Sequence, residues 1–202
     1  MDKVENVPLP PDEDRRKLLA GATAAAGGLA LAGASAPFLA SLAPSERAKA
    51  AGAPAGVNIG RLKPGELVTV EWRGKPVWIL RRTPAMLSGL SALRAQLSDP
   101  DSLVESQQPS YARNPTRSVD REILVTVSLC THLGCIPTYR PEPGSLQSDW
   151  RGGFYCPCHG SKFDLAGRVF KGSPAPTNLV IPPHAYAGAG RLVIGVDRSA
   201  NT

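Results

Sequence analysis

Soft metal ligands are concentrated in one short stretch of this sequence. All four cysteines and two of the three histidines lie between positions 130 and 159. They form two clusters, Cys130-Thr131-His132-Leu133-Gly134-Cys135 and Cys156-Pro157-Cys158-His159-Gly160-Ser161. Each cluster contains a glycine and the second also contains a proline, so each is predicted to be a tight loop, and together the loops offer six sulfur and imidazole ligands.

Three chemistries compete for these six residues. A structural zinc site takes four Cys or His ligands, but its cysteines usually follow a C-x2-C spacing, whereas this chain has C-x4-C and C-x-C. A set of disulfides suits an exported protein but leaves the adjacent histidines unexplained. A 2Fe-2S cluster with two cysteines on one iron and two histidines on the other uses one C-x-H and one C-x2-H pair. The two remaining cysteines can pair in an oxidising compartment, so this third reading accounts for all six residues and is favoured.

The two segments that contain the cysteines and histidines resemble the loops that bind the iron–sulfur cluster in the Rieske iron–sulfur subunit of cytochrome bc complexes (ubiquinol–cytochrome c reductase). The resemblance covers the whole chain. It implies one Rieske-type 2Fe-2S cluster as the cofactor. Cys130 and Cys156 would bind one iron, and His132 and His159 would bind the other. Two neutral imidazoles in place of two thiolates remove negative charge, which raises the reduction potential to about −150 to +300 mV in such centres.

The resemblance also implies a set of supporting residues around the cluster. Cys135 and Cys158 would form a disulfide between the loops, and the Ser161 hydroxyl would donate to a cluster sulfur. Phe163 stands where this family commonly has tyrosine, whose hydroxyl donates to a cysteine sulfur, so we expect a lower potential than tyrosine would give. The residues expected around the exposed tip and in a proline loop behind the cluster are Leu133, Gly134, Gly160, Pro174 and Pro176.

The function implied by the resemblance is quinol oxidation in a respiratory enzyme. His159 and His132 would be the catalytic residues, and His159 would accept the hydrogen bond and a proton from ubiquinol. The chain would pass one electron to a cytochrome c-type subunit while cytochrome b takes the other, within a dimeric, proton-translocating ubiquinol–cytochrome c reductase. The alternative is an anchored Rieske relay subunit of another respiratory enzyme, such as arsenite oxidase, which meets no quinol.

The N-terminal region reads as a membrane anchor. Residues 18–44 carry no charge and are long enough to span a bilayer as a helix. Arg15-Arg16 followed by leucines resembles a twin-arginine export signal. Ala34-Ser35-Ala36 fits a cleavage site, but the apolar stretch continues beyond it, so a retained anchor is expected. This predicts a single-pass protein of the bacterial inner membrane, with residues 1–17 cytoplasmic and the functional domain periplasmic.

The remaining chain reads as a hinge followed by a β-rich domain. Residues 45–56 are small and polar, which is typical of a flexible linker. Residues 57–202 are expected to form a mostly β, Rieske-type antiparallel β-sandwich with a cluster-binding subdomain at about 128–178. The net charge is +6, but the basic residues are scattered among acidic residues and prolines, so the composition does not favour a nucleic-acid partner.

Local patterns predict the elements of this domain. Leucines 87 to 97 recur at helical spacing after Thr83-Pro84 and predict a helix, whereas residues 98–118 read as an irregular loop. His184 lies outside both cysteine-containing loops and is predicted to be a surface or turn residue. The predicted strands are a hairpin of Glu66–Trp72 and Pro76–Leu80, a strand over Ile123–Leu129 and a closing strand over Arg191–Val196.

Overall fold

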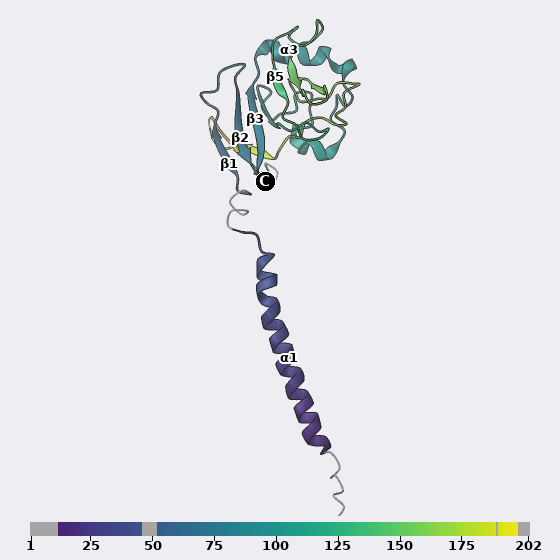
Figure 1. Ribbon diagram of the computed structural model, residues 1–202. Helices are drawn as coiled ribbons and strands as arrows, with labels where there is room; N and C mark the ends of the chain where they lie inside the picture. Colours follow the sequence, from purple (N-terminus) through teal and green to yellow (C-terminus); the bar gives the residue numbers. More distant parts are fainter. Residues whose placement is uncertain (1–11, 46–51, 189, 198–202) are drawn as a thin grey trace, which may run out of the picture. The chain divides into compact units, whose positions relative to one another are not determined.

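The computed structural model of the chain describes residues 12–45, 52–188 and 190–197. The chain divides into two units, Met1–Lys49 and Ala50–Thr202. The first contains helix α1 (Glu13–Ser41), and the second, called the head below, contains all the strands of the described residues (Figure 1).

Helix α1 has the dimensions of a membrane span. It begins after Asp12, whose carboxylate accepts the backbone N–H groups of Asp14 and Arg15. Its 29 residues extend over about 43 Å at 1.5 Å per residue, and an 18-residue window has a mean hydropathy of 1.5. None of its described side chains is buried in the protein. Length and composition therefore agree with the expected anchor, although a signal sequence would pass the same test.

The head is built from three antiparallel sheets of three strands each. Each sheet is small. In one of them, a strand from the start of the head pairs with a strand from its end, so the fold closes only when both ends of the domain have formed. The sheets, in order of neighbouring strands, are β1 (Ala55–Asn58), β9 (Arg191–Ile194) and β8 (His184–Tyr186); β2 (Leu67–Trp72), β3 (Lys75–Arg81) and β4 (Ile123–Val127); and β5 (Thr138–Arg140), β6 (Gly153–Tyr155) and β7 (Lys162–Phe163).

Strand β3 lies between two hydrophobic cores. Val77 and Ile79 pack into one core with side chains of β4 and β9, whereas Trp78 and Leu80 face the other. Because side chains alternate along a strand, both faces of β3 are buried, and its sequence is a continuous apolar run. The Trp78 ring stacks on Phe154 of β6 at 5.0 Å between centroids. The second core therefore supports the β5–β6–β7 sheet, in which β5 follows the first cysteine-containing loop and β6 and β7 flank the second.

The predicted hairpin and helix are confirmed, with altered ends. Strands β2 and β3 join through Arg73 and Gly74, which have φ angles of 53° and 67°, as a two-residue hairpin turn requires. Helix α3 (Pro84–Ala92) begins at Thr83, whose hydroxyl accepts the Met86 N–H. The helix is shorter than the leucine pattern predicts, because the chain continues as the 3-10 turn η1 (Arg94–Gln96). The leucines still reach the core: Leu90, Leu93 and Leu97 are all buried.

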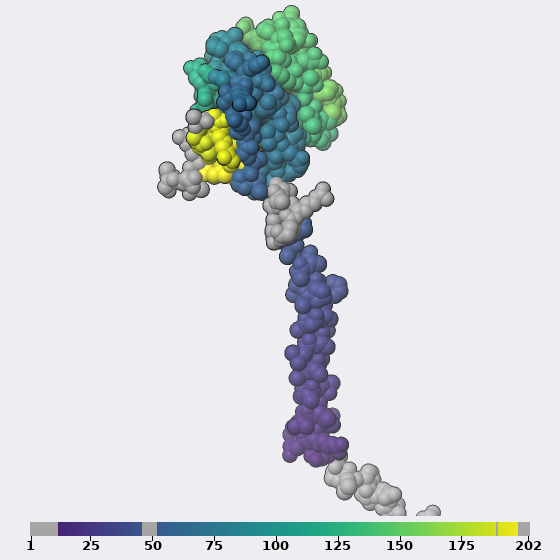
Figure 2. Space-filling model, turned by 90° about the vertical axis from the view of Figure 1, so that its left-hand side faces the viewer, coloured from purple at the N-terminus to yellow at the C-terminus, as the bar shows by residue number. Residues whose placement is uncertain are grey.

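The ends of the domain differ from expectation in two respects. Strand β1 begins at Ala55, so the segment expected to be a hinge, 45–56, overlaps this strand at its C-terminal end. Residues 46–51 of that segment lie outside the described residues. The closing strand β9 ends at Ile194 rather than at position 196, because Gly195 has a φ of 92° and its bare Cα faces Trp72. Strand β9 pairs with β1, and the yellow and blue segments lie side by side in Figure 2.

One further expectation is wrong. His184 is completely buried on β8, where its ring contacts the rings of Tyr111 and Tyr186, so it is neither a surface nor a turn residue. Residues 98–118 are irregular, as predicted, but they are firmly attached to the rest of the head. They contain the 3-10 turns η2 (Glu105–Gln107) and η3 (Ser110–Ala112) and carry buried polar side chains whose hydrogen bonds join them to the rest of the head. The predicted strand over 123–129 is present but ends at Val127.

Candidate functional site

The two cysteine-containing segments fold as equivalent loops, the first loop (130–135) and the second loop (156–161). In each, the N–H of the fifth residue donates to the carbonyl of the first, at 2.9 Å, and the N–H of the first donates to the carbonyl of the sixth, at 2.8 Å. The fifth residue is a glycine with a φ of 82° in the first loop and 80° in the second, a conformation that glycine adopts without strain. The residues in these positions are Cys130, Gly134 and Cys135, and Cys156, Gly160 and Ser161.

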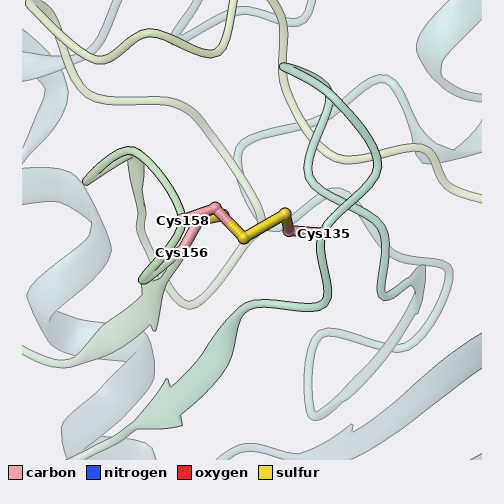
Figure 3. Close-up of side chains that lie close together, drawn as sticks. All are labelled: Cys135, Cys156 and Cys158. Atoms are coloured by element: carbon pink, nitrogen blue, oxygen red, sulfur yellow. A yellow bond between two sulfur atoms is a disulfide. The ribbon is translucent and has the colours of Figure 1, made fainter.

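A disulfide between Cys135 and Cys158 joins the loops, as the resemblance implied (Figure 3). The Sγ atoms of Cys156 and of the two bonded cysteines all lie within 4.8 Å of one another. Sulfurs in a disulfide cannot act as thiolates, so they are not candidate metal ligands. Cys130 and Cys156 are free and only 3% and 2% exposed, which leaves them as the two thiols of the site.

The Cys156 thiol lies in an environment that disfavours its charged form. Burial raises its pKa, and a hydrogen bond with the Cys130 side chain raises it further. The backbone N–H groups of Cys158 and His159 point at its sulfur and oppose this shift. Two adjacent thiols in a dry site ionise readily only when a cation is present, so the arrangement fits a bound metal centre.

His132 and His159 approach each other at the outer side of the loops. Their ring centroids are 4.7 Å apart and the rings are nearly perpendicular, at 87°. His132 is half-buried and its Nδ1 is buried without a hydrogen-bond partner, whereas His159 is exposed. A buried ring nitrogen without a partner costs about 1–3 kcal/mol unless a metal takes its lone pair. Two buried thiols and two converging imidazoles thus form a donor set that fits the expected cluster.

The tip of the site is apolar and exposed. Leu133 is 71% exposed, and the neighbouring Gly134 is also exposed. Ile136, which was not predicted to belong to the site, is 55% exposed immediately after the first loop. The accessible His159 thus belongs to a surface that also presents large apolar side chains, which suits contact with an apolar molecule or an apolar protein face.

The proline loop supports both cysteine-containing loops from behind. The Ala175 N–H donates to Ser161 Oγ at 3.0 Å, and Ser161 is completely buried. Pro174 and Pro176 are exposed on either side of the buried Ala175. Thr131, a residue that was not predicted, donates its hydroxyl to the Thr177 carbonyl at 2.7 Å and so fixes the first loop to the same segment.

Phe163 lies in the second hydrophobic core behind the second loop. It is completely buried on β7 and pairs with Phe154 on β6. Its ring therefore contributes to packing, and no hydroxyl is present at this position to donate to a sulfur.

Four buried ionisable residues lie behind the second loop and were not predicted. Asp164 and Arg168 form an ion pair at 2.7 Å, and two further guanidinium groups contact the same segment. The sequence holds one signal for the ion pair, an aspartate and an arginine four residues apart directly after the second loop. The complete set is Arg82, Arg117, Asp164 and Arg168.

The geometry of the site, with two thiols, two imidazoles and a disulfide on paired loops, defines a class of iron–sulfur protein. Residues 57–183 match the family described as the Rieske [2Fe-2S] domain, and the chain belongs to this family. This confirms the mostly β Rieske fold and the 2Fe-2S cofactor.

Within this family, the individual proteins that the chain resembles over most of its length are iron–sulfur subunits of respiratory enzymes. The chain is 56% identical over 188 residues to the ubiquinol-cytochrome c reductase iron-sulfur subunit of Allochromatium vinosum, which covers 92% of this chain and 90% of that one. It is 40% identical to the subunit of the same name from Blastochloris viridis, over 90% and 92% of the two chains. A chain of the solved structure described as "Hyperthermophilic respiratory Complex III" aligns with a TM-score of 0.45 and 27% identity, over 87% of this chain and 98% of that one.

Proposed function

We propose that this chain is the electron-transferring iron–sulfur subunit of a ubiquinol–cytochrome c reductase. The single observation that carries the proposal is that the rings of His132 and His159 meet, 4.7 Å apart, on the two loops that also hold the free, buried thiols of Cys130 and Cys156. The relatives that share 56% and 40% identity along most of the chain carry this name. Cys130 and Cys156 would hold one iron, and His132 and His159 the other.

The two histidines would have different tasks. His132 is half-buried with an inward, unpartnered Nδ1, so its main role would be that of a ligand. His159 is exposed, so it is accessible to ubiquinol and would accept a hydrogen bond and then a proton from the quinol hydroxyl. When bound, the cluster supplies a one-electron acceptor next to that proton acceptor. Leu133 and Ile136 would exclude water from the contact.

The partners and the location follow from the same assignment. Helix α1 would anchor the subunit once in the bacterial inner membrane, with residues 1–17 cytoplasmic and the head periplasmic. The head would receive its electron next to cytochrome b and deliver it to a cytochrome c-type subunit, within a dimeric complex. The segment between α1 and β1 would act as the hinge. Arg15-Arg16 would direct export of the folded, cluster-containing chain.

An EPR-monitored redox titration of the purified full-length chain, repeated at several pH values around neutrality, tests the proposal. We expect a reduced 2Fe-2S signal with a positive midpoint potential that falls as the pH rises, because reduction is coupled to protonation of a ligand histidine. Zinc in place of iron would overturn the electron-transfer assignment. A low midpoint that does not respond to pH would overturn the quinol-oxidising role and support the relay alternative.

A further inference from the structure

A short turn behind the second loop is surrounded by buried charge. The turn, Asp164–Arg168, begins directly after Phe163. Three guanidinium groups and one carboxylate meet there, and none of the four residues is more than 2% exposed. Burying a guanidinium is costly even when its hydrogen bonds are satisfied, so three of them around five residues need a physical reason. The side chains are Arg82, Arg117, Arg168 and Asp164.

The carboxylate and the guanidinium groups together fix the backbone of the turn. Asp164 Oδ1 accepts the N–H groups of Ala166, at 2.9 Å, and Arg168, at 2.8 Å. Arg82 donates to the Leu165 carbonyl at 3.1 Å. Three successive carbonyls therefore accept a guanidinium N–H, because Arg117 donates to the carbonyls of Ala166 and Gly167 at 3.3 Å each.

Each guanidinium also binds a distant segment, so the turn is held against the rest of the head. Arg82 reaches the Thr116 carbonyl and the Ser118 hydroxyl. The other Nη of Arg117 donates to the Gln107 carbonyl and to Gln108 Oε1. Arg168 donates to the carbonyls of Leu90 and Pro100.

Arg117 is the least expected member of this set. It has no carboxylate within ion-pair distance among the described residues, and its oxygen partners are neutral. Its backbone is left-handed, with a φ of 49°, a conformation that is strained for a residue with a side chain. Burial lowers its pKa to about 10, so it remains charged at neutral pH. A buried, strained residue without a direct ion pair persists only where surrounding contacts hold it in place.

The turn sets the register of the chain that returns to the second loop. After Arg168, the Phe170 N–H donates to the Lys162 carbonyl at 3.0 Å, and the Lys162 N–H donates to Ser173 Oγ at 3.1 Å. The next contact in this series is the Ala175 N–H on Ser161 Oγ, at 3.0 Å. Because that oxygen accepts the Ala175 N–H, the Ser161 hydroxyl is oriented by the returning strand.

We propose that Arg117 is a positioning residue that acts through Ser161. By clamping the carbonyls of Ala166 and Gly167, it fixes the turn, and the turn keeps Ala175 on Ser161 Oγ. The Ser161 hydroxyl hydrogen is thereby directed toward the metal centre, beside Cys156, whose N–H the Ser161 carbonyl accepts. The inference rests on the proposed function, because it assigns Ser161 a bond to the cluster.

A double-mutant cycle of midpoint potentials in the full-length, cluster-containing chain tests this proposal. We expect Arg117→Gln to lower the midpoint, because a displaced Ser161 donates a weaker bond and the reduced centre loses stabilisation. In the Ser161→Ala background the same substitution is expected to cause little further shift. Arg73→Gln is the matched control, since Arg73 is also left-handed, with a φ of 53°, but is exposed at the hairpin tip; it should leave the midpoint unchanged.

A second readout does not depend on the cluster. Hydrogen exchange of the full-length chain, followed for peptides that contain Ala175, should show lost protection in Arg117→Gln and wild-type protection in Arg73→Gln. If Arg117→Gln does not fold, the milder Arg117→Lys variant, which keeps the charge but loses the fork of donors, should show both effects in smaller measure. Equal midpoint shifts in the presence and absence of Ser161, or unchanged protection at Ala175, would overturn the proposal. Failure of the proposed function alone would leave the exchange result standing.

Discussion

One oxygen atom separates Phe163 from the tyrosine that the resemblance led us to expect at that position. Phe163→Tyr would place a hydroxyl in the core directly behind the second loop. A donor to a cluster sulfur stabilises the more negative, reduced state, so we expect the midpoint potential to rise. A differential hydrogen bond of about 1 kcal/mol corresponds to a rise on the order of tens of millivolts for one electron.

A redox titration of this variant beside Phe170→Tyr checks the expectation. Phe170 is half-buried against Trp150, so its variant adds a hydroxyl to the head at another place. An unchanged or lower midpoint in Phe163→Tyr, or an equal rise in both variants, contradicts the assignment of this position to cluster tuning.

His184 predicts a dependence of stability on pH that is separate from the redox chemistry. Burial lowers its pKa, although a hydrogen bond between Nδ1 and the Pro182 carbonyl, at 2.8 Å, opposes the shift. Its Nε2 is buried without a partner. The unfolded chain therefore takes up a proton near pH 6.5, whereas the folded chain does so only at lower pH. The free energy of unfolding should consequently fall as the pH drops below that value.

Urea unfolding of the full-length chain and of His184→Gln, each at neutral and mildly acidic pH, measures this contribution. The variant should lose less stability than the wild type on acidification, because glutamine does not titrate. Identical losses in the two proteins would show that His184 does not control the acid sensitivity.

At the residue scale, functional residues that follow a short, regular spacing can be predicted from the sequence. Residues that come together only when the chain folds cannot. The candidate ligand residues could be singled out because sulfur and imidazole side chains with C-x-H and C-x2-H spacing have few structural uses. Arg117 could not be recognised in this way, because the Ala166 carbonyl to which it donates lies 49 positions away in the sequence. His184 was misplaced because a lone histidine carries no pattern, and the contacts of its ring with Tyr111 and Tyr186 form only when the chain folds.

At the scale of elements, the two cysteine-containing loops depend on their left-handed glycines. A Cβ at Gly160 would meet no atom within 4 Å, so the effect of Gly160→Ala should come from its φ of 80° alone. We expect a loss of about 1–2 kcal/mol in the free energy of unfolding. Gly89 in α3 has equally open surroundings but an ordinary helical backbone, so Gly89→Ala should stabilise the chain by about 1 kcal/mol.

Chemical denaturation of these two variants decides the point, because their expected effects have opposite signs. A Gly160→Ala variant as stable as the wild type would contradict the role given to the left-handed backbone at Gly160.

Element length decides which parts of this fold could be predicted. The β2–β3 hairpin and β4 contain runs of five to seven residues with strong β preference, and they were expected. Strands β5, β6 and β7 contain three, three and two residues, which is too few for any periodicity. They exist because they pair with one another against the second core, and that information is not local.

At the scale of the whole molecule, the twin arginines predict that the head is exported by the twin-arginine route. Replacing both Arg15 and Arg16 by lysine keeps the positive flank of α1 but removes the recognised pair. We expect the chain to remain on the cytoplasmic side, because that route carries proteins that have already folded around a cofactor.

Protease accessibility of the head in spheroplasts measures export directly. Lys17→Gln is the control, since it removes a neighbouring charge and leaves the arginine pair intact, and its head should stay accessible. A double-lysine variant whose head is digested as readily as the wild type would contradict the export assignment.

The pairing of the first and last strands has a mechanical consequence. If α1 anchors the chain as proposed, any pull from the membrane reaches the sheets of the head first at Ala55, the first residue of β1. That strand is only four residues long and is hydrogen-bonded to β9 in the register Ala55↔Ile194 to Asn58↔Arg191. Since β9 also pairs with β8, the load passes into a sheet whose strands all come from the two ends of the domain. Strand β9 therefore holds β1 in place, and the hydrogen bonds between β1 and β9 would bear tension before it could reach the cysteine-containing loops.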